Sequence, residues 1–147
     1  MSQAARAQLV SRLVFQNKSQ KSDLLDAGQT QTQLIAIGLE ITSKGYILEV
    51  TAVRKDHGND AYLGLHSHAN GYCMDCWPLK SKNAGDYLDA TDPKFQAFLE
   101  ALSDSPWLYQ IGLVGDGADS PENFVAAGKT AFQDDGGPHV HIGANGP

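Results

Sequence analysis

Four of the five histidines fall in two short segments, and the polar side chains of each segment are spaced so that they can meet at one point. The first segment contains His68 and, seven residues later, Asp75. The second contains His139 and His141, which would share one face of a strand because alternate side chains do. Two neutral imidazoles and one carboxylate make three ligands, the number with which a catalytic zinc ion keeps a fourth position for water. The two segments therefore predict a zinc site built from His68, Asp75 and one histidine of the second pair.

A strand must hold the first of these segments. Residues 72–77 are apolar or aromatic around one aspartate, and we expect Pro78 to end the strand there. Cys73 and Asp75 would point to one face and Cys76 to the other. The two cysteines form Cys-x-x-Cys, but a redox pair needs a helix N-terminus and a zinc knuckle needs a second pair. We therefore expect two small buried hydrophobic residues.

The spacing resembles the first zinc motif of the D-alanyl-D-alanine carboxypeptidase-like metallopeptidases. That motif places His, Gly, a small residue and Asp at fixed intervals after a polar residue, and the matching positions here are His66, His68, Gly71, Cys73 and Asp75. The His139 and His141 pair resembles the second motif of the wider superfamily, which joins lysostaphin-type endopeptidases, D-Ala-D-Ala peptidases and the hedgehog signalling domain. Residues 47–54, which end in Arg54, resemble the strand before the zinc loop, so the likeness covers roughly residues 31–142.

The resemblance implies that His68, Asp75 and His141 bind zinc and that His139 is the general base or a transition-state partner. Arg54 would hold a substrate carboxylate or stabilise the oxyanion; the alternative is an ordinary ion pair with Asp56 or Asp60. His66 stands where the family usually has serine, so it would line the cleft and bind substrate or close the fourth zinc position. His57 and Trp77 are expected to be loop and packing residues.

Two further departures affect the choice of base. Cys73 replaces the usual alanine, and Pro138 replaces a glutamate that many carboxypeptidase-type members carry. The base would then be His139, as in the endopeptidase branches, or Asp134 or Asp135 in the preceding turn.

The remaining elements indicate an α+β fold with a small antiparallel sheet that carries the zinc site and is flanked by helices. We expect one domain over residues 1–147, with an N-terminal helix and linker in 1–23 and a core in 31–142. The expected helices are 2–15, 31–44 closed by Gly45, one that begins at Asp92 and Pro93, and a short one at 121–128. The expected strands are 46–53, 107–114 and 138–142, with polar loops at 17–23, 55–65 and 115–120.

Composition limits the classes of function. The chain has 147 residues and a formal net charge of −6, and it lacks the basic stripe of a nucleic-acid-binding surface. No stretch is long and apolar enough for a transmembrane helix, and the N-terminus lacks the apolar core of a signal peptide. We therefore expect synthesis in the cytoplasm and action on the cell wall after release or as part of a virion.

These observations lead to one main hypothesis and two alternatives. The main hypothesis is a zinc metallopeptidase that hydrolyses a peptide bond in peptidoglycan stems or cross-bridges, as a bacteriophage endolysin does. The first alternative is a virion or tail protein that carries this domain as a wall-penetrating or binding module. The second is a zinc-stabilised binding domain without hydrolytic activity, which a closed four-ligand site would favour.

Overall fold

A computed structural model describes residues 1–58, 65–114, 130–133 and 139–146. The helices in these ranges are α1 Gln3–Arg12, α2 Lys18–Leu25, α3 Thr32–Ser43 and α4 Pro93–Ser103. The strands are β1 Val14–Phe15, β2 Ile47–Ala52, β3 Cys73–Leu79, β4 Leu108–Val114, β5 Thr130–Gln133 and β6 His139–Ala144. The expected loop at 115–120, helix at 121–128 and turn at 134–137 lie outside the described residues.

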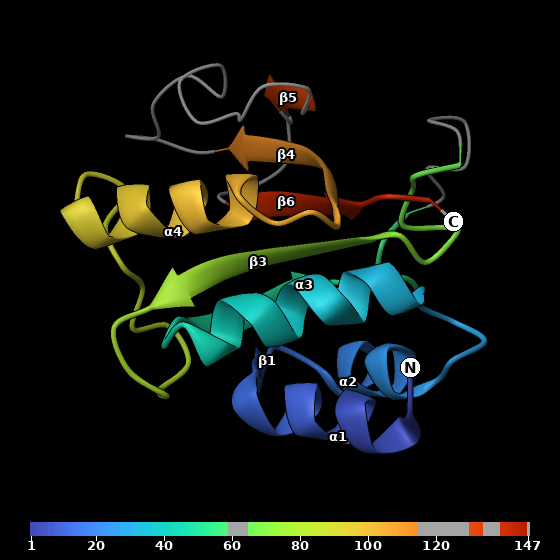
Figure 1. Ribbon diagram of the computed structural model, residues 1–147. Coiled ribbons are helices and arrows are strands. Elements are labelled where there is room, and N and C mark those ends of the chain that lie inside the picture. The colour runs from blue at the N-terminus through green and yellow to red at the C-terminus, as the bar shows by residue number, and fades with distance from the viewer. Residues whose placement is uncertain (59–64, 115–129, 134–138, 147) are drawn as a thin grey trace.

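The described strands form one mixed sheet in the order β1-β2-β3-β6-β4-β5 (Figure 1). The four strands β2, β3, β6 and β4 pair antiparallel, whereas β1 and β5 lie parallel to β2 and β4 at the two edges. The α+β class and the antiparallel sheet at its centre are confirmed. The parallel edge pairs were not predicted, because β1 and β5 are short and their partners are distant in sequence.

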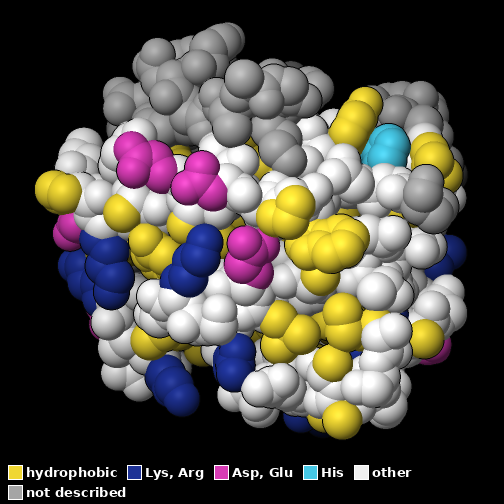
Figure 2. Space-filling model, viewed as in Figure 1, with side chains coloured by type: hydrophobic (Ala, Val, Ile, Leu, Met, Phe, Trp, Pro, Cys, Tyr) yellow, Lys and Arg dark blue, Asp and Glu magenta, His cyan; other side chains and the backbone are white. Residues whose placement is uncertain are grey.

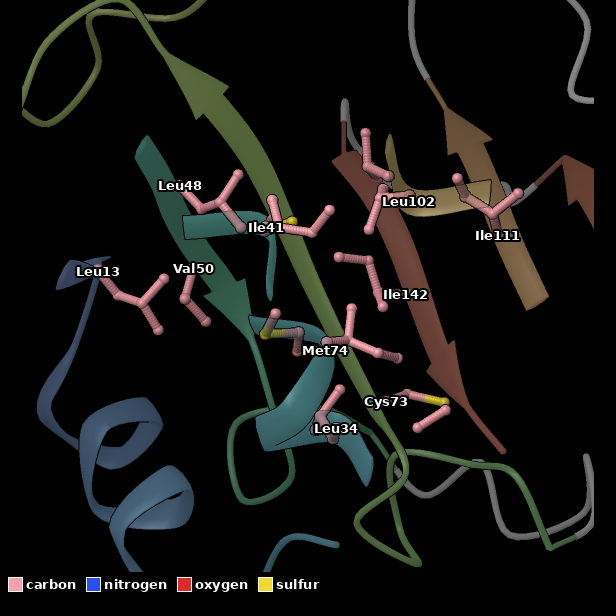
Figure 3. Close-up of a cluster of buried hydrophobic side chains, with 14 of the residues drawn as sticks. Leu13, Leu34, Ile41, Leu48, Val50, Cys73, Met74, Leu102, Ile111 and Ile142 are labelled. Atoms are coloured by element: carbon pink, nitrogen blue, oxygen red, sulfur yellow. The ribbon is translucent and has the colours of Figure 1, made fainter. Parts of the chain in front are cut away.

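Helices α3 and α4 cover one face of this sheet, and α1 and α2 lie beside its β1 edge (Figure 1). The covered face is apolar: Met74, Ile142 and Ile111 from neighbouring strands pack with Leu34 of α3 and Leu102 of α4 (Figure 3). Alternate strand residues must point to the opposite face, which carries the polar side chains. The site residues on β3 and β6 therefore lie on the face away from α3 and α4.

Both helices on this face were predicted correctly. Asp92 caps α4 by accepting a hydrogen bond from Lys94 N at 2.8 Å, and Pro93 is its first residue. α3 ends at Ser43, and Gly45 follows with a φ of +93° in the C-terminal role expected of it.

The N-terminal region differs from the prediction. The first helix ends at Arg12, and Leu13 turns the chain into the short strand β1. The expected linker at 17–23 is instead helix α2, which begins with a capping box between Asn17 and Gln20. The prediction was wrong because α2 has no apolar stripe; its stability comes from these caps and from burial of Gln20, Asp23 and Leu24.

Pro78 does not end β3, as was expected, because the strand continues to Leu79. Pairing with β6 covers only Cys73 to Cys76, so at Pro78 the side opposite β2 meets only a short segment, in which Leu88 N donates to Pro78 O at 2.9 Å and Tyr87 forms a single bridge with Leu79. A proline is tolerated at such an edge position because the missing N–H faces no partner strand.

The surface on the side of α3 and α4 shows scattered charges. Among the described residues on the face seen in Figure 2, Lys and Arg side chains lie near acidic ones and are separated by hydrophobic side chains. No helix in the described part of the chain is long and apolar enough to cross a membrane.

Candidate functional site

Asp75 lies at the centre of a cluster of four histidines on the polar face of the sheet. Its Oδ1 atom is 3.2 Å from His68 Nε2 and 3.1 Å from His141 Nδ1. Its Oδ2 atom is 3.8 Å from His57 Nε2 and 3.8 Å from His139 Nε2. The sequence-predicted residues His68, Asp75, His139 and His141 are therefore brought together, and His57 joins them.

The sheet places two of these residues directly. Asp75 on β3 and His141 on β6 are opposite each other in the antiparallel pair, so their side chains leave the same face. His139 lies two residues before His141 and shares that face. His68 comes from the loop that precedes β3, and its Nδ1 lies 2.5 Å from the carbonyl oxygen of Val53, the residue after β2.

Outer hydrogen bonds fix which nitrogen of each ring faces Asp75. A carbonyl oxygen only accepts, so His68 Nδ1 donates to Val53 and leaves Nε2 as the atom directed at the cluster. His141 Nε2 lies 2.9 Å from Gln110 Oε1 and donates to it, which leaves Nδ1 directed at Asp75. In the neutral rings, both inward atoms are therefore lone-pair acceptors.

Gly143 makes the contact between Gln110 and His141 possible. Gln110 on β4 pairs with Gly143 on β6. A Cβ atom at position 143 would lie 2.4 Å from Gln110 Cγ, a distance that no real side chain tolerates. The glycine thus leaves the space through which the Gln110 amide reaches the His141 ring.

Asp75 is ionised in this cluster. Burial alone would raise the pKa of its carboxyl group. When the two rings are protonated, hydrogen bonds from His141 and His68, together with their charges, outweigh burial and hold the pKa well below its usual value. The cluster therefore presents one carboxylate oxygen and two ring nitrogens, 3.1 to 3.2 Å apart, as a near-equilateral triangle.

The triangle fits a small metal ion. Tetrahedral ligands about 2.0 Å from a zinc ion lie about 3.3 Å from one another, close to the spacings of these three atoms. Three acceptors this close repel one another unless protons or a cation lie between them. The donor set of two imidazoles and one carboxylate also suits zinc and related divalent ions.

In the described part of the chain, two overlapping groups of buried or half-buried side chains have ligand atoms within 4.8 Å of one another and could hold a metal ion. They are His68, Cys73 and His141 in one group, and His57, His68 and Asp75 in the other. Cys73 lies two residues before Asp75 on the same face of β3, so it stands beside the triangle as a further possible ligand. Both cysteines are buried, as expected, and neither forms a disulfide; burial raises the pKa of the Cys76 thiol.

Two predicted site residues, Arg54 and His66, contact parts of the chain other than the cluster around Asp75. The Arg54 guanidinium donates to the carbonyl oxygens of Gly28 and Gln29 at 3.2 and 3.1 Å, in the turn before α3. His66 Nδ1 donates to Ala144 O at 2.9 Å, and its ring stacks on Tyr109 with centroids 4.0 Å apart. Their proposed contacts with substrate stay predictions. Pro138, Asp134 and Asp135 lie outside the described residues.

Two residues of the site were missed from the sequence. The ring of His57 stacks on that of His68, with centroids 3.8 Å apart and planes 3° apart, and its Nδ1 lies 2.8 Å from Gly58 O. Gln110 Oε1 accepts the hydrogen bond from His141 Nε2, the ring nitrogen that faces away from Asp75. The only sequence signal for His57 was its place in a polar loop next to the predicted strand, and Gln110 had no signal beyond its place in a strand.

Comparison with protein-family models, curated proteins and solved structures found no match to this chain.

Proposed function

We propose that this protein is a zinc-dependent peptidase that acts on peptide bonds of peptidoglycan stem peptides or cross-bridges. The observation that carries the metal part of the proposal is the triangle of His68 Nε2, Asp75 Oδ1 and His141 Nδ1, whose edges of 3.1 to 3.2 Å suit a tetrahedral ion. The peptidase part rests on the resemblance of the two histidine motifs to those of the metallopeptidases.

The position of His139 supports a catalytic rather than a purely structural site. A zinc ion held by the triangle would supply a Lewis acid that polarises a carbonyl group and acidifies water. His139 lies beside the second oxygen of Asp75, and its side chain keeps 11% of its surface exposed. It can therefore accept a proton from water and donate one to a leaving amine, the role predicted for it.

His57 completes the outer wall of this arrangement. Its side chain is 28% exposed, which is more than the side chains of the other three histidines around Asp75. Its Nδ1 donates to Gly58 O, so its Nε2 faces Asp75 as an acceptor. We assign it a positioning role, because its ring lies flat against that of His68 and limits rotation of that ligand.

Cys73 favours a second candidate function. If its thiol were to occupy the fourth position beside His68 and His141, the site would be closed, as in structural zinc sites. The protein would then be a zinc-stabilised binding domain without hydrolytic activity. In the present arrangement Cys73 Sγ donates to His66 O at 3.2 Å, an engagement that favours the open site.

The test pairs metal content with hydrolysis. Purified protein should contain one zinc ion per chain and release new amino groups from purified peptidoglycan; chelation should stop the release and zinc should restore it. His139→Ala should keep its zinc and its thermal midpoint but lose about 100-fold or more in rate. Zinc without release would favour the binding domain, and the absence of bound metal would overturn the proposal.

A further inference from the structure

A cavity of about 480 Å³ opens on the same face of the sheet as the metal cluster. Its wall includes Trp77 of β3, which lies two residues beyond Asp75 and shares its face. Two residues of a strand span about 7 Å, so the cavity begins roughly one dipeptide away from the metal triangle. We call this cavity the Trp77 pocket.

Two hydrogen bonds, one buried and one partly buried, fix two walls of the Trp77 pocket. The Trp77 indole nitrogen donates to Leu88 O at 2.8 Å, and the ring packs on Phe95 with centroids 4.8 Å apart. The Tyr87 hydroxyl donates to the carboxylate of Glu49, which is only 2% exposed. A pocket whose aromatic walls are locked in this way loses little side-chain entropy when a ligand enters.

Glu49 fixes the position of the Tyr87 wall. Its Oε2 also accepts from Gln16 Nε2 at 3.3 Å, and its Oε1 accepts from Gly85 N at 3.0 Å. Because three donors surround the carboxylate, its charge is compensated within the wall and is not available to a ligand. Any charged group that enters the pocket must therefore be recognised by the residues at its rim.

The rim carries one charge of each sign. Lys80 and Asp89 both line the pocket and are exposed. Asp89 Oδ1 accepts from Thr91 N and Thr91 Oγ1 at 2.8 and 2.7 Å, which leaves the outer side of its carboxylate toward solvent. Among the described residues, Lys80 and Asp89 are not joined in an ion pair, so the two charges can bind separate groups of one ligand.

We propose that the Trp77 pocket is a substrate subsite for a peptide residue whose side chain ends in a free amino group and a free carboxylate on the same carbon. The carboxylate would pair with Lys80 and the amino group with Asp89, while the aliphatic stem would lie between Trp77 and Tyr87. This inference rests on the proposed peptidase function, since the pocket wall at Trp77 is two residues along β3 from Asp75 of the triangle that would hold the metal.

Tryptophan fluorescence can test the proposal directly. The chain has two tryptophans, so the Trp107→Phe variant reports Trp77 alone. The probe is the tripeptide L-Ala-γ-D-Glu-meso-diaminopimelate, and the matched probe carries L-lysine in the third position and so lacks the terminal carboxylate. We expect saturable change of Trp77 emission by the first tripeptide and about tenfold weaker binding of the second.

Variants in the Trp107→Phe background distinguish the two rim residues from the rest of the connection between β3 and α4. Lys80→Ala and Asp89→Asn should each weaken binding of the diaminopimelate tripeptide about tenfold. Asparagine keeps the oxygen that accepts from Thr91, so the turn is preserved. Lys82→Ala is the control, because Lys82 belongs to the same connection but lines a different cavity, and it should change affinity less than twofold.

Each outcome decides a distinct point. Unchanged Trp77 emission, equal affinity for the two tripeptides or unchanged affinity of Lys80→Ala would overturn the subsite. Zinc content of the same samples is measured in parallel. Bound zinc without tripeptide binding would overturn the subsite alone, whereas tripeptide binding without bound zinc would support the subsite and overturn the zinc peptidase proposal.

Discussion

Asp75 and His141 stand directly opposite each other in the β3–β6 pair, with Oδ1 and Nδ1 3.1 Å apart. Their separation is set by the hydrogen-bonded ladder between two inner strands, so two corners of the metal triangle are as rigid as the sheet. The third corner, His68, comes from a loop and is fixed by its hydrogen bond to Val53 O.

Replacing Asp75 should abolish tight metal binding. Asp75→Asn keeps the shape of the side chain but removes its charge, so we expect zinc affinity to fall at least about 100-fold. Cys73→Ser is the matched control on the same face of β3 and should stay within about threefold of the parent protein. Competition with a chromophoric chelator measures both.

Substituting cobalt for zinc would show spectroscopically if Cys73 were a metal ligand. A thiolate-to-cobalt charge-transfer band that disappears in Cys73→Ser would show that Cys73 is a ligand. That result, with weaker zinc binding in the same variant, would replace the open site by a closed one.

Gln110 should affect metal affinity without touching the metal. Gln110→Leu removes the acceptor of His141 Nε2–H and lets the ring rotate or change tautomer, so zinc affinity should fall about 10- to 100-fold. Gln110→Glu keeps an oxygen at that place and should retain tight binding. Isothermal titration with zinc measures both variants, and equal affinity of the leucine variant and the parent would remove Gln110 from the site.

Gly71 should be far less tolerant of substitution than Gly85, although their φ angles are +79° and +80°. A Cβ at position 71 would lie 2.2 Å from Gln29 O, whereas one at position 85 would meet nothing within 4 Å. Gly85→Ala should cost about 1 kcal/mol of unfolding free energy and Gly71→Ala about 3 kcal/mol or more. Urea unfolding measures the difference, and similar losses would mean that the backbone at Gly71 moves freely away from the turn before α3.

Asp56 should make the fold sensitive to acid. Burial would raise the pKa of its carboxyl group, but hydrogen bonds from Val53 N and from the Gln20 and Asn17 side chains outweigh burial and lower it. A lowered folded-state pKa means that this stabilisation is complete above the usual carboxyl pKa of about 4 and is lost as the pH falls through the folded value. Because the group is partly exposed, the effect should stay below about 1 kcal/mol.

The measurement compares the parent protein with Asp56→Asn. Urea unfolding at pH 6 should show the parent to be the more stable of the two, and the difference should shrink steadily as the pH is lowered below 4. A difference that stays constant with pH would mean that the hydrogen bonds of Asp56 do not depend on its charge.

The sequence predicted those parts of the fold that carry their own local signals. α4 has an aspartate cap, a proline at its first position and apolar residues at helical spacing, and the structure contains it as predicted. Asp75 and His141 were predicted as ligands from alternation along strands and from the motif resemblance, and His68 from its spacing to Asp75 and from the resemblance; the structure brings the three together. Alternation fixes which strand side chains share a face, and this was sufficient to place Asp75 and His141 but not His68, which lies in the loop before β3.

Residues that depend on pairing between distant segments could not be predicted. Gln110 meets His141 only because β4 and β6 are aligned in one register, with Gly143 leaving room, and one sequence does not specify that register. His57 reaches Asp75 by stacking on another loop residue, His68. The burial of Glu49 likewise depends on hydrogen bonds from Tyr87 and Gln16, which belong to other elements.

The place of β6 in the sheet also has a consequence for biosynthesis. His141 follows Asp75 by 66 residues, and its strand must insert between β3 and β4, which are translated earlier. At about 5 to 20 residues per second, a ribosome needs roughly 3 to 13 s to cover that distance. Throughout that interval the nascent chain offers a metal only His68 and Asp75 from the triangle. If the triangle binds zinc as proposed, a nascent chain in which β6 has not yet joined the sheet would lack one of the three ligands.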